Sequence, residues 1–431
     1  MSLSVACFDV FLELSNSVRF TGCNVFEQEF RIPPTGKTYI TGGLVIVFCI
    51  MSITSIYRFA DTLENLTLAI LTFGLSIQAI VKLSMITLNI KTVRTVPVLA
   101  SEFVANFENN PGVCEIFRWY IDICNRFRKY IFLMYVGTVI GATVCSLIVT
   151  AATNSKALPF GAVLPLIDYE SDLGYAMNYC YFTVLTVYGA YGLFASDYLI
   201  LTCMTIACAQ VDTIAVTCED LSQYLEIFGA ENDEEVTDLM KTIIKTHQMH
   251  IRFMKLLHRR FSLHSFVIIV SSMICIAIAS FVLIKAFWIN GILMIVLFFW
   301  QLVTVFSAGG VYMARVEDVQ MKINTTSWHL LPVRKQKMFL CIIQNFQFIA
   351  EPSALSLFSL NFQTLVKVNN LENNLIFSPH SNYISYFSVL ENCLSILDAP
   401  FQLLGLTCNG RRHDTQVKGL TNQGHYQHYR H

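Results

Sequence analysis

The sequence has 431 residues, of which 54% are hydrophobic and only 14% are charged. Because a water-soluble chain carries roughly 25% charged residues, this composition excludes a set of soluble domains and predicts that much of the surface faces lipid. The 29 basic and 30 acidic residues leave a net charge of −1, which excludes a general nucleic-acid-binding protein, since that class needs a strongly basic field.

Six apolar stretches follow one another along the chain, each near the length of about 20 residues that a helix needs to cross a membrane. They comprise residues 38–57, 65–81, 130–155, 174–196, 261–284 and 286–314. The second stretch has an alternative end at Ile90, past Lys82. The apolar character of the fourth stretch continues past Asp197 to Val211, so we expect that helix to extend beyond the bilayer. None of the stretches, bounded in this way, holds a pair of carboxylates, which argues against a proton-coupled pump.

The seventh crossing is interrupted. Residues 338–350 are apolar but too short to span, and Pro352 ends them because proline cannot continue a helix without losing a hydrogen bond. We therefore expect an all-α membrane protein with seven transmembrane helices, the seventh being discontinuous. The expected divisions are a six-span bundle with cytoplasmic anchor helices (1–350), the seventh helix (351–397) with an insertion near 369–382, and a disordered tail (398–431).

Lysine and arginine residues indicate the orientation, because cytoplasmic loops carry an excess of them. The N-terminal segment and the second, fourth and sixth loops hold 20 of these residues, whereas the first, third and fifth loops hold three. This bias predicts a cytoplasmic N-terminus and, after seven crossings, an extracellular C-terminus. A G-protein-coupled receptor has the opposite orientation, and the chain lacks the Asp/Glu-Arg-Tyr and Asn-Pro-x-x-Tyr motifs of that class.

Two loops are long enough to carry structure of their own. The third is acidic and holds Pro159 and Pro165, and we expect it to be an ordered external loop over the mouth of the bundle. The fourth, residues 212–260, is acidic first and basic later. We interpret it as two cytoplasmic helix extensions joined by an acidic turn near 231–235, which would form a cytoplasmic anchor; a plain solvated loop is the alternative.

The sequence holds no P-loop, GxSxG or HExxH motif and no cysteine pairs with zinc spacing. We therefore expect neither an enzyme nor a protein that needs a metal or cofactor. Aromatic and hydroxyl side chains gather instead in the predicted outer halves of the helices, and such a set suits a small apolar ligand. The candidate pocket residues are Phe73, Thr143, Ser146, Met177, Tyr179, Tyr181, Phe182 and Tyr188, together with Phe287 and Trp288. Ordinary helix packing and interfacial aromatic belts are the alternative for each of them.

The C-terminal part carries motifs that are similar to those of one known family. The motifs are Trp328, Leu331-Pro332, Arg334-Lys335, Gln344, Ser359-Leu360-Asn361-Phe362 and Ser385-Tyr386-Phe387-Ser388-Val389-Leu390. With the seven-helix, N-terminus-inside topology, they resemble the insect odorant receptor family over about residues 37–390. The resemblance implies a subunit that binds small volatile apolar ligands and, with a co-receptor subunit, forms a heterotetrameric, odorant-gated, non-selective cation channel in the plasma membrane of a sensory neuron.

By the same resemblance, the last helix lines the pore. Val389 matches an apolar constriction, and Ser385, Ser388 and Asn392 are its candidate pore-facing neighbours. The family's shared co-receptor has a longer fourth loop, so this chain resembles a ligand-tuning subunit. The insertion near 369–382 and the 41 residues after Leu390 depart from the family pattern, and an unusual splice form or an imperfect gene model would explain both. A gustatory-type receptor channel and a multi-span transporter are the alternative functions.

Overall fold

The computed structural model describes residues 2–17, 19, 22, 26, 36–88, 90–153, 156–165, 167–230, 233–285, 289–347, 351–355, 357–361 and 363–366. All of them belong to one unit, Met1–His380, and a second unit comprises Ser381–His431. Several predictions fall outside the described residues. These are the pore residues Ser385, Ser388, Val389 and Asn392, the pocket residues Phe287 and Trp288, the insertion near 369–382 and the tail.

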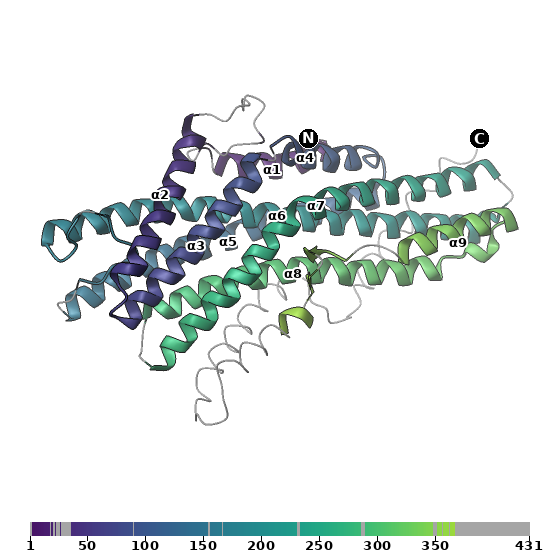
Figure 1. The fold of residues 1–431 in the computed structure, drawn as a ribbon. Coiled ribbons are helices and arrows are strands. Elements are labelled where there is room, and N and C mark those ends of the chain that lie inside the picture. Colours follow the sequence, from purple (N-terminus) through teal and green to yellow (C-terminus); the bar gives the residue numbers. More distant parts are fainter. Residues whose placement is uncertain are drawn as a thin grey trace, which may run out of the picture. The chain divides into compact units, whose positions relative to one another are not determined.

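The described part of the chain is almost entirely helical, and six of its helices are long and apolar enough to cross a membrane (Figure 1). They are α2 (Gly36–Arg58), α3 (Leu63–Leu88), α5 (Pro111–Thr153), α6 (Asp172–Phe228), α7 (Asp233–Lys285) and α8 (Ile289–Thr325). Each contains one of the six predicted apolar stretches or coincides closely with it. The prediction of six spans in an all-α membrane protein is therefore confirmed.

Three of these helices are much longer than a bilayer is wide. α5 has 43 residues, α6 has 57 and α7 has 53. At about 1.5 Å per residue, α6 is roughly 85 Å long, against a hydrocarbon core of about 30 Å. Only residues 229–232 separate α6 from α7, so the fourth loop consists of two helix extensions, as predicted, but three acidic residues expected in the turn, Asp233, Glu234 and Glu235, form the first turn of α7.

Local sequence explains where the longest helix begins and ends. The hydroxyl of Ser171 accepts a hydrogen bond from the N–H of Gly174 at 3.1 Å, and Asp172 lies at the positive end of the helix dipole. At the other end, Gly229 has a φ of 66° and donates its N–H to the carbonyl of Leu225. Glycine adopts this left-handed cap without steric cost, so the chain can reverse at once into α7.

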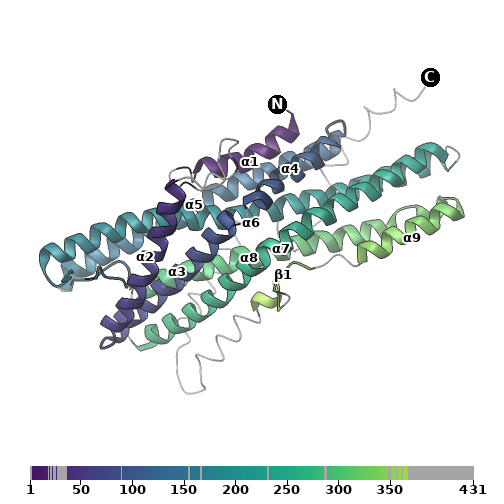
Figure 2. The same ribbon diagram turned by 45° about the horizontal axis from the view of Figure 1, so that its top comes forward.

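α6 forms the centre of the bundle. In its most apolar window 89% of the residues are buried, compared with 22% in the corresponding windows of α2 and α5. α5, α7 and α8 run alongside α6 and contact it (Figures 1 and 2). α2 and α5 instead expose apolar side chains, including Ile46, Ile50, Leu133 and Ile148, and these form a surface suited to lipid.

Two shorter helices that the sequence patterns did not predict pack against the long helices, the first beside α5 and the second beside α7. They are α1 (Leu3–Ser17) and α4 (Ile90–Ala105), which lie next to each other (Figure 2). α1 buries one face, formed by Cys7, Val10, Phe11 and Leu14 at helical spacing. Because α5 also begins at Pro111, well before the predicted start, the predicted second loop is mostly helical.

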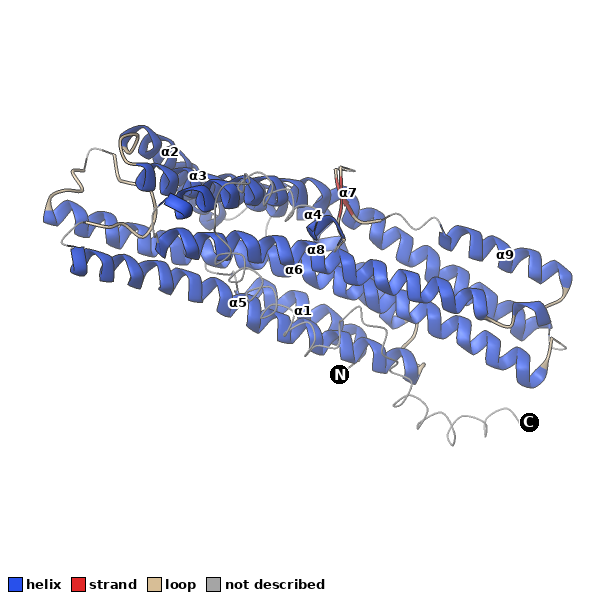
Figure 3. Ribbon diagram, turned by 90° about the horizontal axis from the view of Figure 1, so that it is seen from below, coloured by secondary structure: helices blue, strands red, loops and turns tan. Residues whose placement is uncertain are grey.

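After α8 the chain forms two short helical elements and a hairpin of two strands (Figure 3). The elements are the 3-10 turn η2 (Trp328–Leu330), α9 (Val333–Gln347) and the antiparallel strands β1 (Ser353–Ala354) and β2 (Phe358–Ser359). The sequence predicts the start of a discontinuous helix here, and the structure differs because the Leu360 N–H donates back to the Pro352 carbonyl. The hydroxyl of Ser262 on α7 holds the hairpin: it accepts from the Leu355 N–H at 2.6 Å and donates to the Ser353 carbonyl at 3.1 Å.

Candidate ligand-binding region and buried polar layer

The loop between α5 and α6 folds into one end of the bundle. Its described residues are 156–165 and 167–171. Four of its apolar side chains are buried: Leu158, Phe160, Ala162 and Val163. The prediction of an ordered loop at the mouth of the bundle agrees with this arrangement, although the loop is packed between helices rather than laid across them.

Side chains of three helices hold the backbone of this loop. In each contact a loop N–H donates to a buried oxygen in α3, α2 or α6, which satisfies a backbone group that would otherwise be lost from water. The contacts run from Gly161 to Thr72 (3.1 Å), from Val163 to Ser55 (2.9 Å) and from Leu164 to Asn178 (2.7 Å). The loop therefore closes this end of the bundle through specific hydrogen bonds.

Gly161 lies where the loop backbone comes closest to α3. A Cβ atom at this position would lie 2.2 Å from the nitrogen of Ala69 and 2.3 Å from the carbonyl carbon of Leu68. Both neighbours are backbone atoms of a helix and cannot move aside alone. Only glycine fits between the loop and the helix without displacing one of them.

Three of the predicted pocket residues meet between α5 and α6. The hydroxyl of Tyr179 donates to the backbone carbonyl of Thr143 at 2.5 Å, and the hydroxyl of Ser146 lies 3.5 Å from it. One turn earlier, the hydroxyl of Tyr175 makes a similar contact with Thr150 at 3.0 Å. These tyrosine hydroxyls join the two helices in the present structure.

Three other predicted residues lie on the side of α6 that faces α2. Phe182 is fully buried and packs in one cluster with Met51. The ring of Tyr181 meets that of Phe182 edge-on, with centroids 5.3 Å apart. The hydroxyl of Tyr188 lies 3.0 Å from that of Thr41.

Two predicted residues lie apart from both groups. Met177 exposes 47% of its surface on α6, and Phe73 is half-buried on α3. The predicted set is therefore divided between two sides of α6, and its role as a ligand pocket stays a prediction.

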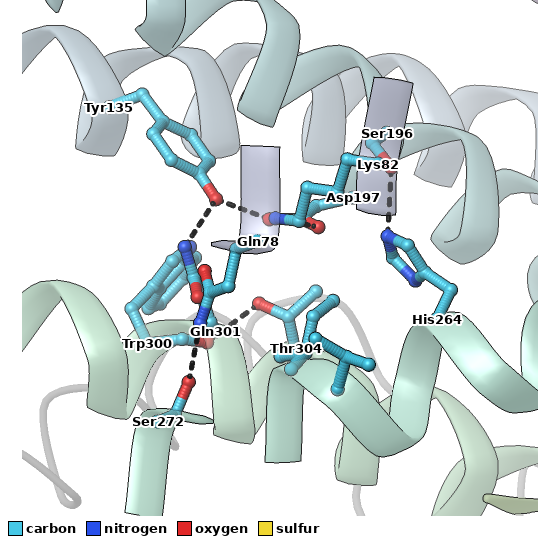
Figure 4. A network of polar contacts seen from close by, with 12 residues as sticks. Gln78, Lys82, Tyr135, Ser196, Asp197, His264, Ser272, Trp300, Gln301 and Thr304 are labelled. Carbon is cyan, nitrogen blue, oxygen red and sulfur yellow. Dashed lines mark hydrogen bonds and ion pairs between the residues drawn. The ribbon is translucent and has the colours of Figure 1, made fainter. Parts of the chain in front are cut away.

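An ion pair lies farther along the bundle from the loop (Figure 4). Nζ of Lys82 on α3 is 2.6 Å from Oδ1 of Asp197 on α6, and the two side chains are 3% and 5% exposed. The other carboxylate oxygen accepts a hydrogen bond from the hydroxyl of Tyr135 on α5. Buried charges within membrane helices are costly and mark functional sites. Here one carboxylate joins three helices.

Two glutamines extend this network. Nε2 of Gln301 on α8 donates to the hydroxyl oxygen of Tyr135 at 3.3 Å. Nε2 of Gln78 on α3 donates to the hydroxyls of Ser271 and Ser272 on α7, at 2.8 Å and 3.2 Å. These side chains and their buried neighbours form a polar layer that comprises Gln78, Lys82, Tyr135, Ser196, Asp197, His264, Ser271, Ser272, Trp300 and Gln301. Within it, Ser196 and His264 share a hydrogen bond of 2.9 Å.

The sequence patterns missed the polar layer because Lys82 and Asp197 were taken to mark the ends of the membrane-spanning stretches, although both helices were expected to continue past them. α3 in fact continues to Leu88 and α6 to Phe228, so Lys82 and Asp197 lie inside helices. A signal was available: apolar residues continue on both sides of each charge, and Gln78 stands four residues before Lys82, on the same helix face. Within the described ranges, no group of three or more His, Cys, Asp or Glu side chains is placed to hold a metal ion.

Long apolar helices around a buried polar layer define a multi-pass, all-helical membrane protein. The family model of the 7tm Odorant receptor matches residues 45–371, and the chain therefore belongs to the odorant receptor family. Because this is a family of receptors, the prediction that the chain is not an enzyme is confirmed.

Solved insect receptors have a similar fold. The insect olfactory receptor OR5 from Machilis hrabei aligns with a TM-score of 0.69 and 11% identity, over 84% of this chain and 95% of that chain. The same receptor in complex with eugenol aligns with a TM-score of 0.66 and 12% identity, over 86% of this chain and 98% of that chain. No curated protein matches this sequence.

Proposed function

We propose that the chain is an odorant receptor subunit that binds a small volatile ligand and, with a co-receptor subunit, forms an odorant-gated, non-selective cation channel. The observation that carries the proposal is the match to the odorant receptor family over residues 45–371. A receptor of similar fold has been solved in complex with eugenol, which supports a small ligand. The proposed location is the plasma membrane of a sensory neuron.

The proposed ligand region lies between the loop that closes the bundle and the polar layer. Its candidate contacts are Phe73, Thr143, Ser146, Met177, Tyr179, Tyr181, Phe182 and Tyr188. A ligand opens the channel only if it binds the open state more tightly than the closed one. A volatile of about ten heavy atoms, at roughly −0.5 kcal/mol per atom, gains about −5 kcal/mol, which is a Kd on the order of 100 μM. Modest affinity and broad tuning are therefore expected.

The distribution of charge supports a cytoplasmic N-terminus, since 20 lysine and arginine residues lie on one side of the predicted spans and three on the other. In this orientation the loop between α5 and α6 is extracellular. The cytoplasmic portions of α6, α7 and α8 then form the anchor together with that of the predicted seventh helix. The short turn at 229–232 supports a ligand-tuning subunit, because the co-receptor of the family is expected to have a longer loop there.

The pore assignment rests on the sequence. Val389 is the proposed apolar constriction, which would block ions by dewetting. Ser385, Ser388 and Asn392 are its proposed neighbours along the path of the cations. The resulting channel would be a heterotetramer with the co-receptor.

Expression in a heterologous cell with and without an insect co-receptor tests the function. The expected result is a cation current evoked by volatile ligands in cells that express both subunits, with the co-receptor alone as the control. Solute uptake without current would contradict the proposal and favour a transporter. A ligand-evoked current from this chain alone would contradict the requirement for a co-receptor.

A further inference from the structure

The polar layer contains buried atoms that lack a hydrogen-bond partner among the described residues. Besides Nδ1 of His264 and the two atoms of the ion pair, they are the amide oxygens of Gln78 and Gln301 and the indole N–H of Trp300. These side chains are 0%, 1% and 8% exposed. An unpaired buried polar group costs about 1–3 kcal/mol, and hydrocarbon around the bundle offers no replacement. Three such atoms indicate that the layer takes a partner that the helices do not supply.

The orientation of both amides is fixed by their neighbours. The hydroxyl of Ser271 donates to the Val267 carbonyl at 2.6 Å, so it must accept from the nitrogen of Gln78. The hydroxyl of Tyr135 donates to Asp197, so it must accept from the nitrogen of Gln301. Turning either amide over would lose its hydrogen bond to Ser271 or to Tyr135, and in the present orientation both oxygens are unpaired. α3 and α8 are in contact, and Gln78, Gln301 and Trp300 gather in the same part of the network (Figure 4).

The chemistry of these atoms defines which hydrogen-bonding groups the missing partner must have. Two free oxygens need a donor, and the indole N–H needs an acceptor. A hydroxyl group supplies both, whereas an aldehyde or ketone only accepts and a hydrocarbon does neither. An ammonium group only donates, and it would bring a second positive charge to within one helical turn of Lys82.

The depth of the layer sets the length of an apolar body attached to that hydroxyl. Gln78 lies 15 residues after Leu63 and Gln301 lies 12 residues after Ile289, so they are about 22 Å and 18 Å from the loop-side ends of their helices. Tyr179 lies about 10 Å from the corresponding end of α6. The two glutamines therefore lie about 10 Å deeper in the bundle than Tyr179. A volatile alcohol of medium length is about long enough to span this distance.

We propose that the polar layer is the subsite for the hydroxyl group of the ligand, and that the best ligands of this receptor are volatile alcohols or phenols with an apolar body. The hydroxyl donates to Gln78 or Gln301 and accepts from Trp300. This inference rests on the proposed receptor function and adds the chemical class of the ligand to it.

Matched ligands test the inference in cells that express the chain with the co-receptor. One set is octanol, octanal and octane, and a ring set is phenylethanol, phenylacetaldehyde and ethylbenzene. In each set we expect the alcohol to give half-maximal current at a concentration about tenfold below that of the hydrocarbon.

Trp300→Phe is the sharpest variant, because it removes an N–H that has no partner in the folded helices. If Trp300 only packs, the smaller ring shifts the responses to alcohol, aldehyde and hydrocarbon together. The subsite predicts instead that alcohol and aldehyde each require about five- to tenfold more ligand, with the hydrocarbon unchanged. Gln301→Leu should weaken the alcohol alone, since an aldehyde cannot donate.

Gln320→Leu is the matched control, because this glutamine of α8 lies outside the polar layer and donates to the Phe346 carbonyl at 3.0 Å. It should leave the ratio of alcohol to hydrocarbon sensitivity unchanged. Equal sensitivity to alcohol and hydrocarbon, or a Trp300→Phe variant that leaves their ratio unchanged, would overturn the inference while the receptor function stood, and would indicate that internal water fills the layer. Absence of current with every ligand would instead overturn the receptor function, and the subsite with it.

Discussion

Removing one charge of the Lys82–Asp197 pair is expected to destabilise the bundle far more than removing both. At 2.6 Å and an effective dielectric constant of about 20, the two charges attract each other by about 6 kcal/mol. Burying each ion costs several kcal/mol, so the net contribution of the pair is close to zero. Loss of one partner leaves an uncompensated buried charge, which costs about 3–5 kcal/mol. Almost no solvent screens these side chains, so this magnitude needs no discount for exposure.

Three variants form the test: Lys82→Met, Asp197→Asn and the double variant. The Asp197→Asn change keeps an oxygen that can accept from Tyr135, so the comparison isolates the charge. Thermal unfolding in detergent, followed as the fraction of monodisperse protein, measures stability. Each single variant should unfold at a clearly lower temperature than the unmodified chain, and the double variant should recover most of the loss. Additive losses would refute the reasoning, because independent sites add and coupled sites do not.

Three further predictions concern the loop and the predicted pocket. Gly161→Ala should lower the free energy of unfolding by about 1–3 kcal/mol and reduce the amount of receptor at the cell surface. Gly189→Ala is the control, because a Cβ at that position meets open space. An equal loss of stability in both variants would contradict the steric explanation. Ser171→Ala should cost about 1 kcal/mol, seen as faster hydrogen exchange in the first turn of α6 alone. Tyr179→Ala and Tyr181→Ala should change the ranking of ligands in current recordings, and an unchanged ranking in both removes them from the pocket.

The length and apolarity of the spans made the fold predictable from the sequence. A run of uncharged residues such as 130–155 has few alternatives to a membrane helix, and apolar character past Asp197 correctly indicated that α6 extends beyond the bilayer. α1 and α4 were missed because their buried faces alternate with polar residues. An amphipathic helix of this kind has no long apolar run and is recognised only by its periodicity.

The candidate site was less predictable, because side-chain partners depend on how each helix is rotated against its neighbours. Tyr179 and Phe182 are three residues apart, and the structure turns one toward α5 and the other toward α2. Lys82 and Asp197 are 115 positions apart in the sequence, so nothing local indicates that they meet. Their pairing follows from the packing of α3 against α6, which only the folded chain determines.

α3 and α6 are held together at two levels of unequal strength. At the loop, Thr72 and Asn178 each accept one neutral N–H bond from the loop backbone, and such a bond contributes about 1 kcal/mol. In the polar layer, separating Lys82 from Asp197 costs about 3–5 kcal/mol. The loop is therefore the weaker connection, and we expect a ligand to enter by displacing it while the ion pair stays closed. Hydrogen exchange tests this order: the N–H groups of Gly161 and Val163 should exchange faster than those of α3 around Lys82, and equal protection would contradict it.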